Sequence, residues 1–177
     1  MTSADSRRLV HDLHELLRAR GATIAVAESL TGGLLGAELT SVAGSSAIFL
    51  GGITAYATPA KASLLGVDQA LLARHGAVHP EVATAMARGA RARFTSTYAV
   101  ALTGVAGPDP QDGAVPGTVQ VAFVGPGGER VRSVHLAGDR ADVRADAVRC
   151  ALELALEVLA APTDLPTDLP SDVPTGG

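Results

Sequence analysis

A short apolar run near the start of the chain limits the fold more than any other feature of the sequence. Residues 23–28 read TIAVAE, a β-branched and apolar segment of the kind that forms a buried strand. The small-residue turn Thr31-Gly32-Gly33 comes soon after it, and LLGAELTSV, which predicts a helix, follows. A strand, a glycine-containing turn and a helix together form the unit that presents side chains and backbone N–H groups at the carboxyl edge of an α/β sheet.

The rest of the chain continues this alternation. Residues 6–20 predict an amphipathic helix, and further helices are expected to begin near residues 58, 69, 80 and 139. Strands are expected in IFLGGITAYA and TYAVALTG, and GTVQVAFVG and ERVRSVHLAG are expected to form a hairpin. The pattern predicts an α/β fold, namely a single-domain, three-layer α/β/α sandwich with a mixed β-sheet.

Composition bounds the domain organisation and the kind of partner. The 177 residues suffice for one folded domain, which we expect over residues 1–161. Residues 162–177 are rich in Pro and Asp, have too little apolar content to pack, and predict a disordered tail. A net charge of -4 argues against a nucleic-acid-binding face, and no apolar run is long enough to span a membrane. Because the N-terminus also lacks the pattern of a signal peptide, we expect a cytoplasmic protein.

The usual metal and cofactor signatures are missing. Cys150 is the single cysteine, so an internal disulfide and a cysteine-based zinc site are excluded. His11 and His14 share a predicted helix, but no third ligand lies near them in the sequence. No dinucleotide fingerprint and no phosphate-binding Walker loop is found. The sequence therefore predicts neither a metal site nor a cofactor.

One basic residue stands apart from the others. Lys and Arg total 14, and Lys61 is the only lysine among them. Arginine cannot lose its proton in a protein, whereas a lysine with a lowered pKa can act as a base. Thr58 is expected to cap the helix that follows it, with Pro59 at the first helical position. Lys61 would then lie in the first turn, where the helix dipole disfavours a cation and lowers its pKa.

Polar side chains gather where the predicted strands end. Ser29 follows the first strand, Tyr56 the second, and Thr103 ends the third. The carboxyl ends of such strands lie along one edge of the sheet, so these groups are expected to meet there. A serine hydroxyl is a weak nucleophile that a neutral Lys61 amine could activate. From the residues alone, a plain helix cap remains the simpler interpretation of Ser29.

Several strings occur in the order typical of one known family. They are AESLTGG, LTSVAGSS, FLGGITAY with AK, HGAV, TGVAGP, PGTV, and GDR with VR. Over residues 8–160 the chain resembles the C-terminal domain of the competence-damage-inducible proteins, the family of bacterial nicotinamide-nucleotide amidohydrolases.

The resemblance implies an enzyme and assigns roles to residues. Such proteins look like Ser-Lys amidases that convert nicotinamide mononucleotide, a small-molecule substrate, to nicotinic acid mononucleotide and ammonia without metal or cofactor. Carried onto this chain, Ser29 is the nucleophile, Lys61 the base and Tyr56 a polar partner. A homodimer or a higher homo-oligomer is also expected. The implied substrate-binding residues are Thr31, Gly32, Gly33, Gly44, Ser45, Ser46, Thr103, Gly104, Ala106, Gly107 and Arg140, with Arg140 suited to pair with the substrate phosphate.

The chain departs from the family pattern at a few positions. Leu30 stands where the family usually has Cys, and His79 where it usually has Ser. Ala57-Thr58-Pro59 replaces the usual Ser-Asn-Glu, and residues 114–116 lack the usual Lys. These differences keep two alternatives open: an amidase for a different small amide, and a non-catalytic module that binds a nucleotide.

Overall fold

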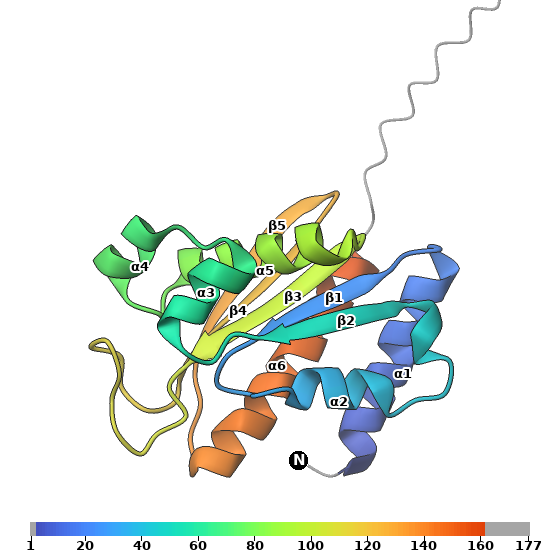
Figure 1. Cartoon of the computed structure of the whole chain (residues 1–177). Helices are drawn as coiled ribbons and strands as arrows, with labels where there is room; N and C mark the ends of the chain where they lie inside the picture. The colour runs from blue at the N-terminus through green and yellow to red at the C-terminus, as the bar shows by residue number, and fades with distance from the viewer. Residues whose placement is uncertain (1–2, 162–177) are drawn as a thin grey trace, which may run out of the picture.

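The computed structural model describes residues 3–161, so the predicted tail at 162–177 lies outside the described residues. Helices and strands follow in the order that the sequence predicts, with three helices in a row before the third strand and three strands in a row before the last helix (Figure 1). The elements are α1 (Ser3–Ala19), β1 (Ile24–Glu28), α2 (Leu34–Thr40), the short 3-10 helix η1 (Ser45–Ala47), β2 (Phe49–Thr54), α3 (Thr58–Leu65), α4 (Gln69–His75), α5 (Pro80–Phe94), β3 (Tyr98–Gly104), β4 (Thr118–Gly125), β5 (Gly128–His135) and α6 (Arg140–Ala160).

The sheet is mixed, in the order β2-β1-β3-β4-β5. The strands β2, β1 and β3 are parallel, whereas β3, β4 and β5 form antiparallel pairs. The predicted hairpin is therefore confirmed. In register, Ile24 faces Phe49 at one end of the parallel pair and Glu28 faces Thr54 at the other. The carboxyl ends of β1, β2 and β3 consequently lie at one edge of the sheet (Figure 1).

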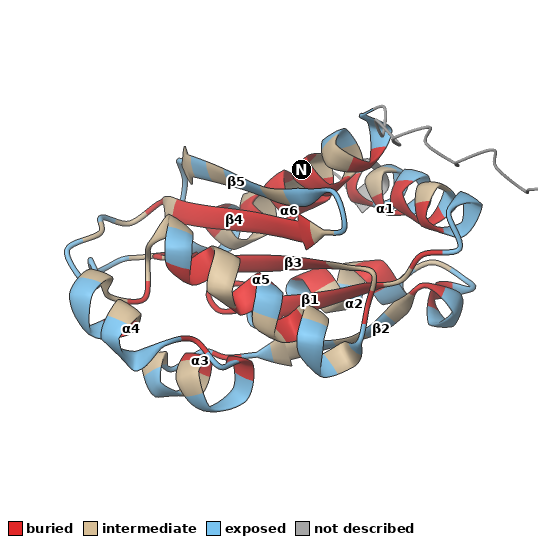
Figure 2. Cartoon of the chain, turned by 90° about the horizontal axis from the view of Figure 1, so that it is seen from above, coloured by how far each residue is buried: buried red, intermediate tan, exposed pale blue. Residues whose placement is uncertain are grey.

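Helices cover both faces of the sheet, which confirms the three-layer architecture. Strands β1, β3 and β4 are buried, whereas the edge strands β2 and β5 alternate between covered and exposed residues (Figure 2). One face carries larger side chains that pack with α1, α2 and α6; they include Val26, Val100, Leu102, Val121 and Phe123. The other face carries mostly small side chains, over which α5 packs; they include Ala27, Ala99, Ala101, Ala122 and Val124. This alternation follows from the two-residue period of a strand.

The starts of the shorter helices differ in part from the prediction. The helix expected near residue 69 is confirmed as α4, and Asp68 caps it, because the Asp68 side chain accepts a hydrogen bond from the Ala70 N–H. The prediction that Thr58 caps α3 is wrong. The N-cap is Ala57, which makes no side-chain cap bond, and Thr58 is already helical. Pro59 still fits the first turn, since its missing N–H would have no helical partner there.

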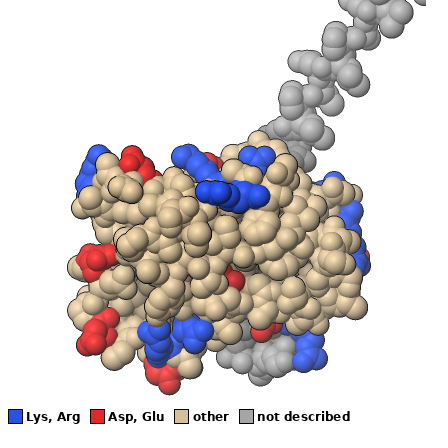
Figure 3. All heavy atoms as spheres, in the orientation of Figure 1, with Lys and Arg blue, Asp and Glu red and all other residues tan. Residues whose placement is uncertain are grey.

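The surface shown in Figure 3 is largely uncharged. Basic and acidic side chains occur in small separate groups on this face, without a continuous basic stripe. Among the described residues, no helix combines the length and the apolar character needed to cross a membrane.

Close packing between α5 and α3 generates a stability prediction. A Cβ on Gly89 would press against the Leu65 carbonyl oxygen, which is backbone and cannot rotate away. In a helix, Gly→Ala ordinarily stabilises by about 0.4–1 kcal/mol. We expect Gly89→Ala instead to lower the free energy of unfolding by about 1–3 kcal/mol through overpacking.

The matched control is Gly36→Ala in α2, where a Cβ would make only ordinary contacts with Glu28 and Phe49. Its free energy of unfolding should stay unchanged or rise. Urea denaturation of both variants measures the difference, and an equal effect of the two substitutions would contradict the packing account.

Candidate active site

The strand order creates a crevice at the carboxyl edge of the sheet. In a sheet ordered β2-β1-β3, the connections that leave β1 and β3 diverge, and ligands bind at such a switch point. A small polar cavity of about 90 Å³ lies there. Its lining comes from the ends of β1, β2 and β3 and the start of α6, and includes Ser29, Tyr56, Gly104 and Arg140. Two of the three residues predicted as catalytic line this cavity.

Lys61 reaches this edge from α3. Its Nζ lies 2.9 Å from Ser29 Oγ, 2.9 Å from the Ala55 carbonyl oxygen and 3.4 Å from the Tyr56 carbonyl oxygen. The side chain is 1% exposed, although lysine is one of the residues least often buried. No carboxylate lies within ion-pair distance of Lys61 in the described part of the chain.

Burial changes the protonation of this amine. Removal from water disfavours the charged form and lowers the pKa of Lys61 from 10.5 to about 8. The negative charge of Asp112 acts in the opposite direction and keeps the pKa from falling further. An amine with a pKa near 8 is neutral in a useful fraction of molecules at neutral pH, so Lys61 can accept a proton from the hydroxyl beside it.

Ser29 does not cap the helix that follows it, so the simpler interpretation of this residue is wrong. The N-cap of α2 is Gly33, in a left-handed conformation and without a side-chain cap bond. The buried carboxylate of Glu28 satisfies the start of the helix instead. It accepts hydrogen bonds from the N–H groups of Gly33, Leu35 and Gly36 at 2.9–3.0 Å. The Ser29 hydroxyl is therefore not needed as a cap and is free to form a hydrogen bond with Lys61.

Arg144 of α6 forms hydrogen bonds with the turn that follows Ser29. Arg144 donates from Nε to the Leu30 carbonyl oxygen at 3.1 Å and from Nη2 to the Thr31 carbonyl oxygen at 2.9 Å. Because a peptide unit is planar, fixing the Leu30 carbonyl also fixes the Thr31 N–H. The N–H groups of Gly32 and Gly33 are already engaged, by the Ser29 carbonyl oxygen and by Glu28. The amides of Leu30 and Thr31 have no such acceptor among residues 3–161.

Tyr56 and Arg140 meet at the mouth of the cavity. Arg140 donates from Nη2 to the Tyr56 hydroxyl and from Nη1 to the Gly107 carbonyl oxygen, both at 2.8 Å. Tyr56 is 58% exposed, so its ring lies toward solvent while its carbonyl oxygen faces Lys61. The phenol is thus part of the rim, and the hydrogen bond from Lys61 to Tyr56 is made to the backbone.

The remaining predicted binding residues fall into two groups. Gly104, Ala106 and Gly107 line the cavity, whereas Thr103 is buried behind it and donates to the Ala77 carbonyl oxygen. The second group precedes β2 and therefore lies at the amino end of the parallel strands, opposite Ser29 (Figure 1). This second group consists of Gly44, Ser45 and Ser46. Within one chain the fold does not bring these three residues to the cavity.

Two supporting residues were missed by the sequence analysis. Glu28 is the last residue of a buried strand, and a carboxylate there should have signalled a nearby set of N–H donors. Arg144 lies one helical turn after Arg140 in a stretch that resembles the family, but sequence alone does not show that it reaches back to the first turn. Both form hydrogen bonds with the backbone around Ser29.

A wider groove of about 680 Å³ lies between α3 and α4. Its lining includes Pro59, Ala62 and Leu72 and contains no titratable side chain. We therefore assign the chemistry to the smaller cavity.

Known proteins are similar to this chain in sequence. The chain is 56% identical over 129 residues to a CinA-like protein of Frankia casuarinae and 50% identical over 130 residues to one of Solibacter usitatus. Each match covers 73% of this chain but only 30% and 31% of the respective relative, so the chain spans about a third of their length.

Solved structures agree with the architecture. A CinA superfamily protein of Klebsiella pneumoniae has a TM-score of 0.85 at 33% identity, covering 88% of this chain and 98% of that one. A competence/damage inducible protein of Agrobacterium tumefaciens has a TM-score of 0.84 at 34% identity, covering 90% and 98%. Residues 6–159 match the family described as the CinA C-terminal domain. The resemblance seen in the sequence is thereby confirmed, and the chain belongs to the CinA C-terminal domain family.

Proposed function

We propose that the protein is a nicotinamide-nucleotide amidohydrolase, which converts nicotinamide mononucleotide to nicotinic acid mononucleotide and ammonia. The observation that carries the proposal is the 2.9 Å contact between the buried Lys61 amine and the Ser29 hydroxyl at a cavity. A serine beside a base with a lowered pKa is the arrangement that nucleophilic catalysis of acyl transfer requires. The choice of this nucleotide rests on the family resemblance.

The first half of the reaction forms an acyl-enzyme. Neutral Lys61 takes the proton of the Ser29 hydroxyl while Ser29 Oγ attacks the carboxamide carbon. The carbonyl oxygen becomes an oxyanion, and Lys61 is then an ammonium. Lys61 returns this proton to the amide nitrogen as the C–N bond breaks, so ammonia departs and the lysine is neutral again.

Backbone amides next to the nucleophile are suited to stabilise the oxyanion. The N–H groups of Leu30 and Thr31 follow Ser29 directly and have no acceptor among the described residues. Arg144 fixes the peptide between them, which keeps the Thr31 N–H in one direction. Donors held in place before the reaction cost no reorganisation when the charge develops.

The second half repeats these steps with water. Lys61 takes a proton from a water molecule, whose oxygen attacks the ester carbon of the acyl-enzyme. Lys61 then gives the proton to Ser29 Oγ as the ester C–O bond breaks. The carboxylic acid product leaves and ionises in solution, and both residues return to their starting forms.

The cavity accommodates only the reacting end of such a substrate. A volume of about 90 Å³ is far below the roughly 300–1,000 Å³ of pockets that enclose whole ligands. The rest of the nucleotide would lie over the rim, beside Tyr56 and Arg140. Arg140 could exchange its bonds to Gly107 and Tyr56 for a phosphate, to which a guanidinium binds in a bidentate manner.

Removing either member of the pair should abolish the reaction. We expect Ser29→Ala, Lys61→Ala and Lys61→Arg each to lower kcat/KM at least about a thousandfold, because the loss of one member disables the unit. Lys61→Arg is the sharper test, since it keeps a positive charge but cannot accept a proton. Ammonia release from nicotinamide mononucleotide, measured with chelator present, gives the rates.

Ser63→Ala is the matched control, because Ser63 is exposed on α3 two residues from Lys61, and it should keep full activity. Urea denaturation shows whether each variant is folded. Retained activity in a Ser29 or Lys61 variant would rule out this mechanism. Release of ammonia by the parent from other amides, but not from the mononucleotide, would instead indicate a different amide substrate.

The rate should depend on pH through Lys61. Because only the neutral amine accepts a proton, we expect kcat/KM to rise with pH and to level off above about 8. Asp112→Asn removes a charge that favours the ammonium, so the midpoint should move to lower pH. The asparagine oxygen can still accept the bond that Asp112 receives from the Ala77 N–H.

The control for this shift is Asp68→Asn, which changes an exposed carboxylate to another good helix cap. Its midpoint should equal that of the parent. An Asp112→Asn midpoint that stays in place or moves to higher pH would contradict the electrostatic account.

A further inference from the structure

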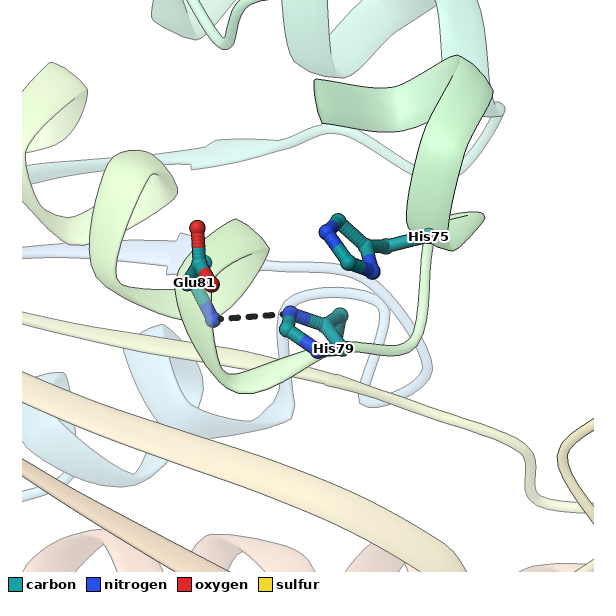
Figure 4. Close-up of side chains that lie close together, drawn as sticks. All are labelled: His75, His79 and Glu81. Atoms are coloured by element: carbon teal, nitrogen blue, oxygen red, sulfur yellow. Dashed lines mark hydrogen bonds between the residues drawn. The ribbon is translucent and has the colours of Figure 1, made fainter. Parts of the chain in front are cut away.

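A cluster of three potential metal ligands lies where α4 passes into α5. His75 is the last residue of α4, His79 is the N-cap of α5, and Glu81 is the second residue of α5. One ligand atom from each lies within 4.8 Å of the others. Figure 4 shows the three side chains close together. We propose that these side chains bind a divalent transition-metal ion, of which Zn²⁺ is the representative. The proposal is independent of the amidase reaction, because neither Ser29 nor Lys61 takes part.

The donor set selects the class of ion. Two imidazoles and one carboxylate suit Zn²⁺ and its neighbours in the first transition row, whereas Mg²⁺ and Ca²⁺ prefer oxygen ligands. Three protein ligands leave a fourth position for water, as in open zinc sites. Both histidines are half-buried and Glu81 is exposed, so an ion can enter from the solvent side.

The side chains need only a small movement to close on an ion. Ligand atoms at about 2.1 Å from a tetrahedral zinc ion lie about 3.4 Å from one another. The two imidazole rings are stacked, with centroids 4.1 Å apart and planes inclined by 18°. Binding therefore requires one ring to turn about its side-chain bonds, so that one nitrogen of each ring faces the ion.

The backbone that carries the ligands is fixed on both sides. Between the two histidines, the Ala77 N–H donates to Asp112 at 2.7 Å, and the Ala77 carbonyl oxygen accepts from Thr103 at 2.7 Å. The Gly76 N–H also continues the hydrogen bonding of α4 to Leu72. The ends of α4 and α5 are thus held together before any ion binds, which lowers the ordering cost of binding.

One existing interaction would be given up. His79 Nδ1 accepts a hydrogen bond of 3.3 Å from the Glu81 N–H and caps α5 (Figure 4). Coordination through Nδ1 displaces this bond, and coordination through Nε2 puts the ring proton on Nδ1 and also removes it. The bond is longer than the usual 2.7–3.2 Å and is exposed, so its loss costs little.

The experiment is a titration of the full chain with Zn²⁺ by calorimetry, after metal is removed with a chelator and the chelator is dialysed away. We expect one ion per chain, bound with a dissociation constant in the micromolar range or below. His75→Ala, His79→Ser and Glu81→Gln should each weaken binding at least tenfold. His79→Ser is informative because serine is itself a good N-cap, so the helix start is kept while the ligand is lost.

The matched control is His135→Ala, which removes an exposed imidazole from β5 and should leave the affinity unchanged. NMR of the five histidine side chains gives a second readout that needs no substitution. Upon addition of Zn²⁺, the His75 and His79 ring nitrogens should shift and the other three should not. Absence of binding, or binding that is insensitive to both His75→Ala and His79→Ser, would overturn the proposal.

Discussion

The buried amine of Lys61 is the constraint around which the rest of the site is arranged. Its three oxygen neighbours are a hydroxyl and two backbone carbonyls, and no carboxylate is close enough to form an ion pair in the described structure. Such surroundings favour the neutral amine more than water does, so burial lowers its pKa to about 8. The strand order makes this position possible, because β1 and β2 end side by side and α3 carries the lysine back over them.

The proposed nucleophile, Ser29, depends on two charged residues that hydrogen-bond to the backbone around it. Glu28 satisfies the start of α2, which frees the neighbouring Ser29 hydroxyl for Lys61. Arg144 holds the two carbonyls that follow Ser29, which leaves the adjacent amides in fixed directions. Strand, turn and helix are thus tied together by hydrogen bonds, which hold Ser29 and the amides after it in place.

Much of the fold, and the two central residues of the site, could be predicted from the sequence. Periodicity located the strands and helices, and the lone lysine in an arginine-rich chain drew attention to Lys61. The predictions that were wrong concern helix caps. Thr58 and Ser29 are both residue types that commonly cap helices, but neither does so here. Glu28 directly precedes Ser29, but the sequence does not show that its carboxylate turns back to bind the N–H groups at the start of α2. The sequence also did not predict where the second group of binding residues lies. A family motif does not show at which end of the strands it is placed, and Gly44, Ser45 and Ser46 lie at the end opposite Ser29.

The proposed mechanism requires Lys61 to be neutral when it meets Ser29, and the pKa of Lys61 can be measured directly. Because Lys61 is the only lysine, protein labelled with ¹³C at lysine Cε gives a single side-chain signal in an NMR pH titration. We expect a midpoint near pH 8 in the folded protein, which moves toward that of an exposed lysine when the protein is unfolded in urea. A midpoint near 10.5 in the folded protein would show that the amine remains charged, and would contradict the assignment of Lys61 as the base.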